Sequence, residues 1–224
     1  MNQFLFGIYP YIVLGVFVVG CIARYDRDPY TWKAGSSQLM RTDKQMVLGS
    51  NLFHIGVLCL FFGHFVGLLT PEPLYHIFMS APTKQVLAMT AGGIFGLVML
   101  AGLFILLRRR LTDPRIRATT QPTDLAILIL LGIQLILGLL TIPVSAMHLD
   151  GSSMIALANW AQHVVTFRGG AADFIVDESI IFKLHLFLGM TLFLLTPFTR
   201  LVHVISAPIW YVFRTGYQVV RSRS

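Results

Sequence analysis

Charged side chains are scarce in this sequence of 224 residues. Asp, Glu, Lys and Arg together make up 12% of it, whereas a soluble domain devotes about a quarter of its residues to charge. Hydrophobic residues make up 55%, and the mean hydropathy is +0.72. This composition excludes an ordinary soluble domain and predicts a chain surrounded by membrane lipid.

Cysteine is almost absent. Cys21 and Cys59 are far apart and form no C-x-x-C motif, so neither an iron–sulfur cluster nor a disulfide is indicated. We expect both to be small apolar packing residues. No nucleic-acid-binding motif accompanies the net charge of +7, and we therefore expect no nucleic-acid partner.

The apolar residues fall into five blocks of about 20 residues, the length that crosses a hydrocarbon core of roughly 30 Å. No block alternates as a barrel strand does. The sequence therefore predicts an all-α integral membrane protein, a bundle of five transmembrane helices that forms one domain over residues 1–224. The predicted spans are 3–23, 46–69, 86–107, 123–146 and 180–203.

The basic residues predict the orientation of this bundle. All of the 17 Lys and Arg except Lys84, Arg168 and Lys183 fall in the first and third connections or at the C-terminal end. By the positive-inside rule the N-terminus is outside, and the C-terminus is cytoplasmic. No Lys or Arg precedes the first block, and Arg24 and Arg27 follow it, so we expect a retained helix rather than a signal peptide.

Four of the seven histidines lie in the predicted spans, where an imidazole is costly to bury: His54, His64, His185 and His203. A proton relay or an interhelical hydrogen bond is one explanation. A relay needs further ionisable groups, and no Asp or Glu lies in the middle of any span. Ligation of a buried metal group is the other explanation.

Antiparallel packing of the second and fifth spans pairs His64 with His185 on the outer side and His54 with His203 on the inner side. Two bis-imidazole sites, one near each face, are typical of a cytochrome that holds two b haems. The spacings along the two helices differ, about 15 Å against about 27 Å. Tilt, a bend near Pro197 or different haem orientations must absorb that difference.

Glycines near these histidines suit a flat macrocycle pressed against a helix: Gly56, Gly63, Gly67 and Gly189. Glycine is also a common packing residue between membrane helices, and the sequence alone leaves both interpretations open.

Four segments together resemble the gamma (cytochrome b) subunit of bacterial respiratory nitrate reductase. They read "SNLFHIGVLCLFFGHFVGLLTP", "LLRRRLTDPRIRATT", "LLTIPVSAMHLDGS" and "IFKLHLFLGMTLFLLTPFTRLVH". The resemblance extends over nearly the whole chain and keeps order and spacing. It implies five spans in the bacterial inner membrane, a periplasmic N-terminus and two b haems held by the four histidines.

The resemblance also implies a mechanism and partners. Menaquinol or ubiquinol is oxidised beside the outer haem, and electrons leave from the inner haem to an iron–sulfur beta subunit and a molybdenum-containing alpha subunit. A lysine at the start of the third span belongs to the family's quinol site, and that position is Lys84 here. Gly63, next to His64, is expected to form a wall of the same pocket. The alternative for Lys84 is an interfacial lysine that extends its ammonium into water.

Two other functions remain open. Related haem b subunits serve sulfur-metabolism complexes of the heterodisulfide-reductase type, and the neighbouring soluble subunits would distinguish the two. A transporter or plain membrane anchor would use the histidines structurally and would bind no haem.

Overall fold

The computed structural model describes residues 1–32 and 44–205, and within these ranges all regular structure is helical. Five helices are long and apolar enough to cross a membrane, as predicted. They are η1 with α1 (Gln3–Ile8 and Tyr9–Arg27), α2 (Lys44–Leu69), α4 (Ala81–Thr112), α6 (Pro122–Ala146) and α8 (Ile180–Leu195). Five basic residues used to predict the orientation lie outside the described residues: Lys33, Arg41, Arg214, Arg221 and Arg223.

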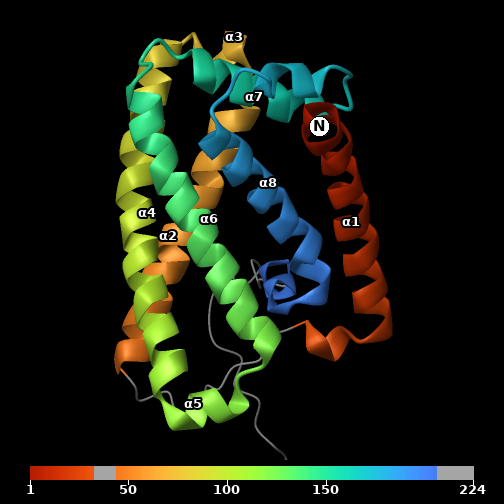
Figure 1. The fold of residues 1–224 in the computed structure, drawn as a ribbon, viewed down its shortest axis with the longest axis vertical. Coiled ribbons are helices and arrows are strands. Elements are labelled where there is room, and N and C mark those ends of the chain that lie inside the picture. Colours follow the sequence, from red (N-terminus) through yellow and green to blue (C-terminus); the bar gives the residue numbers. More distant parts are fainter. Residues whose placement is uncertain (33–43, 206–224) are drawn as a thin grey trace, which may run out of the picture.

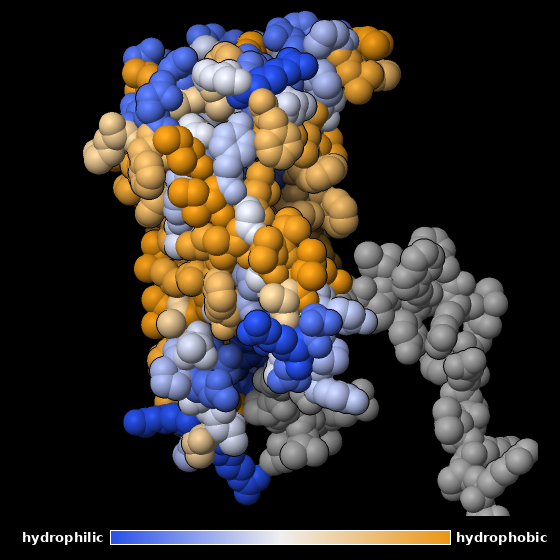
Figure 2. Space-filling model, turned by 90° about the vertical axis from the view of Figure 1, so that its right-hand side faces the viewer, coloured by the Kyte–Doolittle hydropathy of each residue, from blue (hydrophilic) through white to orange (hydrophobic). Residues whose placement is uncertain are grey.

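Shorter helices connect the long ones. They are η2 (Pro29–Thr31), α3 (Glu72–Tyr75), α5 (Pro114–Thr119), α7 (Ser152–Val165), η3 (Ala171–Ile175), η4 (Thr196–Phe198) and η5 (Arg200–Val204). Figure 1 shows α3, α7 and the N-terminus at one end of the bundle, here called the α7 end, and α5 at the opposite end, the α5 end. Between them, the face in Figure 2 carries a belt of hydrophobic residues bordered by hydrophilic ones, as expected of a membrane protein.

Glycines bring α2 and α4 into close backbone contact. A Cβ on Gly56 would lie 2.7 Å from the backbone nitrogen of Met99, and one on Gly102 would meet the backbone of Phe53. Of the two interpretations that the sequence leaves open for Gly56, its surroundings support packing against a neighbouring helix.

The fifth span is not one continuous helix to residue 203. Helix α8 ends at Leu195, the short η4 contains Pro197, and Thr199 is extended. A proline lacks the N–H that would continue the helix and disfavours helical geometry in the residue before it. His203 follows this break, in η5, so it does not lie on one continuous helix with His185.

Helix α7 closes one end of the bundle. The Trp160 indole donates a 2.9 Å hydrogen bond to the carbonyl of Phe6, while the Gln162 amide donates to the carbonyls of Leu68 and Thr70. These bonds join α7 to the start of the first span and to the end of α2, the helix that carries His64.

Candidate functional site: two histidine pairs and a buried lysine

The rings of His64 on α2 and His185 on α8 lie together in the bundle. Their centroids are 6.1 Å apart and their planes are inclined by 40°. Two metal–nitrogen bonds of about 2 Å each, with half a ring width on either side, place the centroids of two axial imidazoles roughly 6 Å apart. This spacing fits a haem iron between the two rings.

Backbone hydrogen bonds orient the imidazoles of His54 and His64. The Nδ1 of His54 lies 2.7 Å from the carbonyl oxygen of Ser50, and that of His64 lies 2.7 Å from the carbonyl of Leu60. A carbonyl only accepts, so each Nδ1 carries the proton and each Nε2 keeps the lone pair that a metal binds. Such a bond fixes both tautomer and ring direction. By contrast, the buried Nδ1 of His185 has no hydrogen-bond partner.

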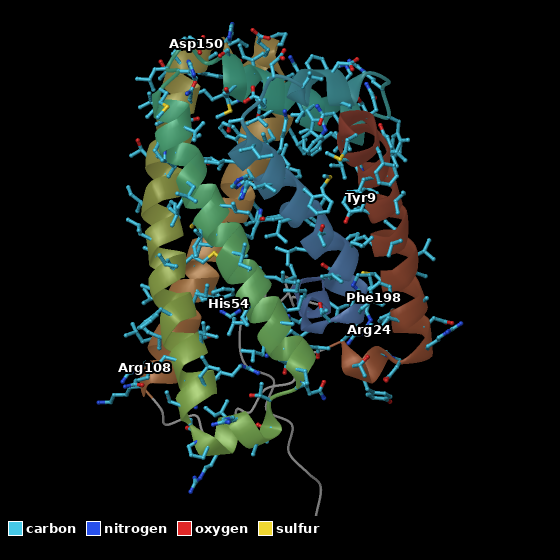
Figure 3. All side chains as sticks on the ribbon, viewed as in Figure 1. Tyr9, Arg24, His54, Arg108, Asp150 and Phe198 are labelled. Atoms are coloured by element: carbon cyan, nitrogen blue, oxygen red, sulfur yellow. The ribbon has the colours of Figure 1, made fainter. Side chains whose placement is uncertain are left out.

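The second pair lies toward the α5 end. Figure 3 shows His54 in that half of the bundle, and His203 lies in η5, after the break in the fifth span. The Nδ1 of His203 is hydrogen-bonded to the carbonyl of Arg200. Arg110 and Arg200 lie 3.4 and 3.7 Å from the same carboxylate, Asp124. The two guanidinium groups therefore share the Asp124 carboxylate at this end of the site.

The glycines around the first pair have different roles. A Cβ on Gly63 or Gly67 would meet nothing within 4 Å, so both positions leave open space beside His64. A Cβ on Gly189 would lie 3.0 Å from the Gln134 amide nitrogen, so this glycine packs against α6. Sequence reasoning missed Gly138: a Cβ there would lie 2.9 Å from Cε1 of His185. Its only sequence signal is a glycine in a long apolar helix, which is too common to single out.

Lys84 lies in the first turns of α4, at the same end of the bundle as His64. Its side chain is only 7% exposed, and its buried Nζ has no hydrogen-bond partner. The ammonium lies 3.8 Å from the centroid of the Tyr75 ring, a cation–π contact. A snorkelling lysine exposes its ammonium to water, and Lys84 does not fit that alternative.

Within the described ranges, no group of three or more His, Cys, Asp or Glu side chains is arranged to hold a metal ion. Two ligands per site are insufficient for a metal held by protein alone, but they are the number needed for a haem iron, which its porphyrin holds in plane. The donor set therefore suits haem b.

Comparison with known proteins decides the family. The model of the nitrate reductase gamma subunit family matches residues 2–223. The chain belongs to this family. It is 54% identical to the respiratory nitrate reductase 1 gamma chain of Escherichia coli K12, over 100% of this chain and 98% of that protein. It is 39% identical to the nitrate reductase gamma chain of Bacillus subtilis 168, over 100% of this chain and 99% of that protein. This family membership, that of a nitrate reductase gamma subunit, confirms the resemblance indicated by the sequence motifs.

Proposed function

We propose that this chain is the quinol-oxidising haem b subunit of a respiratory nitrate reductase. The observation that carries the proposal is the His64–His185 pair, whose ring separation of 6.1 Å suits two axial ligands of one iron. We assign His54 and His203 to a second, inner haem. Residues 1–224 then form one di-haem membrane domain.

The two proposed haem sites lie at different depths in the bundle. Electrons that pass between them therefore move across the membrane. When bound there, haem b supplies one-electron transfer, so that the two sites carry electrons from quinol at the α7 end to an iron–sulfur acceptor at the α5 end. With the α7 end on the periplasmic side of the inner membrane, each electron that crosses adds to the membrane potential. Moving one charge across this potential stores about 2.3 kcal/mol per 100 mV.

The residues of the chain have separate tasks in this proposal. The ammonium of Lys84 binds a quinol oxygen, and the open space beside Gly63 admits the quinol ring next to His64. The guanidinium groups of Arg110 and Arg200 bind a haem propionate or the acidic surface of a beta subunit. A beta subunit with iron–sulfur clusters and an alpha subunit with molybdenum complete the enzyme, with menaquinol or ubiquinol as the reductant.

Haem stoichiometry tests the proposal. The purified complex should contain two b haems per gamma chain by pyridine haemochrome, and His64→Ala and His203→Ala should each lose one. Loss of both haems from a single variant contradicts the crossed pairing. A parent chain without haem would contradict the proposed function and favour a membrane anchor or transporter.

The quinol site has its own test. In Lys84→Ala both haems should remain, whereas quinol oxidation should be lost. Unchanged quinol kinetics would exclude Lys84 from the site. The soluble subunits that purify with the chain distinguish a molybdenum nitrate reductase from a sulfur-metabolism complex.

A further inference from the structure

The short connection between α2 and α4 contains three chemically active side chains close to Lys84. Helix α3 carries Glu72 and Tyr75, and His76 follows directly. The Nε2 of His76 lies 3.6 Å from Oε1 of Glu72, and the side chains of both residues are 47% exposed. Tyr75 is buried and lies beneath the Lys84 ammonium. The Glu72 carboxylate acts electrostatically on both Lys84 and Tyr75. The α3 segment therefore leads from the buried Lys84 ammonium to the exposed Glu72 and His76 side chains at the protein surface.

Quinol oxidation needs such a connection because it releases two protons along with two electrons. Lys84 as an ammonium can hold a quinol oxygen but has no lone pair to accept a proton. Burial, and then the nearby Glu72 carboxylate, raises the pKa of the Tyr75 phenol, so that hydroxyl stays protonated. A proton acceptor is therefore needed beyond these two residues. An imidazole next to a carboxylate is the usual one near neutral pH.

We propose that the Glu72–His76 pair accepts the protons released by quinol at Lys84 and passes them to water at the α7 end. This inference rests on the proposed function. The quinol loses two O–H protons and two electrons and becomes quinone. The electrons leave one at a time toward the site at which His64 and His185 would hold a haem, the one-electron acceptor, and each proton moves through the Glu72–His76 pair to bulk water. Tyr75 is a positioning residue that holds the Lys84 ammonium over its ring.

Other titratable groups at this end lie in a different cluster. The Glu178 carboxylate lies in the electrostatic field of Lys183, His148 and Asp177. The Asp150 carboxylate accepts a hydrogen bond from the Ser152 hydroxyl. The Glu72–His76 pair instead borders the Tyr75–Lys84 contact, because the His76 ring lies 4.7 Å from the Tyr75 ring, centroid to centroid. His148 provides an exposed histidine at the same end for comparison.

The test uses the intact complex in native membrane vesicles, with duroquinol as the electron donor and nitrate as the acceptor. His76→Gln and Glu72→Gln should keep both haems and the dithionite-reduced spectrum. Their kcat should fall by roughly a hundredfold, the lower end of what a positioned proton acceptor contributes, while KM for duroquinol stays unchanged. Added imidazole should restore the rate of His76→Gln, because a free base can replace the missing side chain. His148→Gln should match the parent and show no stimulation by imidazole.

Two results would overturn the inference while leaving the proposed function intact. One is parental kcat in both Gln variants while Lys84→Ala abolishes quinol oxidation. The other is a slow His76→Gln that imidazole does not restore, since this indicates a structural effect. If Lys84→Ala also oxidises duroquinol at the parental rate, the quinol site itself is misplaced and the proposed function fails first.

Discussion

One guanidinium nitrogen of Arg24, Nη1, donates hydrogen bonds to the carbonyl of Pro197 at 2.7 Å and to that of Thr199 at 2.8 Å. Arg24 lies in the last turn of the first span, and Pro197 interrupts the fifth (Figure 3 labels Arg24 beside Phe198). Carbonyls released by a broken helix need donors, and these come from another span. The ring of Pro197 also fits against Gly20, where a Cβ would lie only 2.8 Å from it. The first span thus supports the segment that leads to His203.

Arg24→Ala should therefore affect the inner haem. Hydrogen bonds from a charged donor are worth about 1.5–3 kcal/mol each, and their loss leaves the segment before His203 unsupported. We expect the haem content to fall from two toward one per chain, with the haem at His64 and His185 retained. Redox titration followed at the Soret band gives the measurement.

Arg27→Ala is the matched control, because Arg27 is exposed in the last turn of the same helix. It should retain two haems. Equal loss in the two variants would mean that charge at this end, rather than support of the break, determines haem retention.

Gly138→Leu should remove the outer haem selectively. A Cβ at this position would lie 2.9 Å from Cε1 of His185, so a leucine displaces the imidazole from its place opposite His64. One haem per chain is expected by pyridine haemochrome. Gly15→Leu is the comparison, since a Cβ on Gly15 would meet nothing within 4 Å. A Gly138→Leu chain with two haems would show that the imidazole can move without losing its role.

Gly56→Ala should destabilise the bundle without touching a ligand. The new methyl would lie 2.6–2.8 Å from Cβ, N and Cα of Met99, and a backbone cannot move aside as a flexible side chain does. Overpacking of this kind costs about 1–3 kcal/mol, so Tm of the complex should fall. Gly67→Ala, in the same helix with nothing within 4 Å, should leave Tm unchanged. An unchanged Tm in Gly56→Ala would show that α2 and α4 separate at little cost.

Gln162→Leu should loosen the α7 end. It loses the amide that donates to the carbonyls of Leu68 at 3.0 Å and Thr70 at 3.3 Å, each worth about 0.5–1.5 kcal/mol. We expect a lower Tm with haem content preserved. Gln121→Leu, at an exposed glutamine that makes no capping hydrogen bond at the start of α6, should keep the parental Tm. If both variants behave alike, the side chain of Gln162 contributes no support to α2.

Much of this arrangement follows from simple patterns in the sequence. Five apolar blocks predict the five spans, and antiparallel depth predicts that His64 and His185 face each other, as their ring contact shows. Their role as haem ligands remains a prediction. The sequence predicts the break after Leu195 only as one of three ways to absorb the difference between the two histidine spacings. A proline marks a possible kink without giving its size.

The roles of glycines and of the α3 segment were not predictable in the same way. Gly56, Gly63 and Gly138 look alike in sequence, and only the position of the neighbouring helix separates contact with Met99, open space and contact with His185. Residues 70–83 connect two predicted spans, and nothing in their spacing indicates that Tyr75 lies under Lys84. Hydropathy predicts depth in the membrane, whereas rotation about a helix axis depends on partners distant in sequence.

The bonds made by α7 also set the order in which this protein can assemble. Gly56 meets Met99 across 43 positions and Phe53 meets Gly102 across 49, so α2 and α4 can dock as soon as α4 has been synthesised. Trp160 bonds to Phe6 across 154 positions, and Gln162 bonds to Leu68 across 94. Both wait until four of the five spans have left the ribosome. The α7 end thus closes late in synthesis, shortly before the bonds from Arg24 to Pro197 and Thr199, which join residues 173 and 175 positions apart. The side of the protein proposed to receive quinol therefore stays open through most of its synthesis.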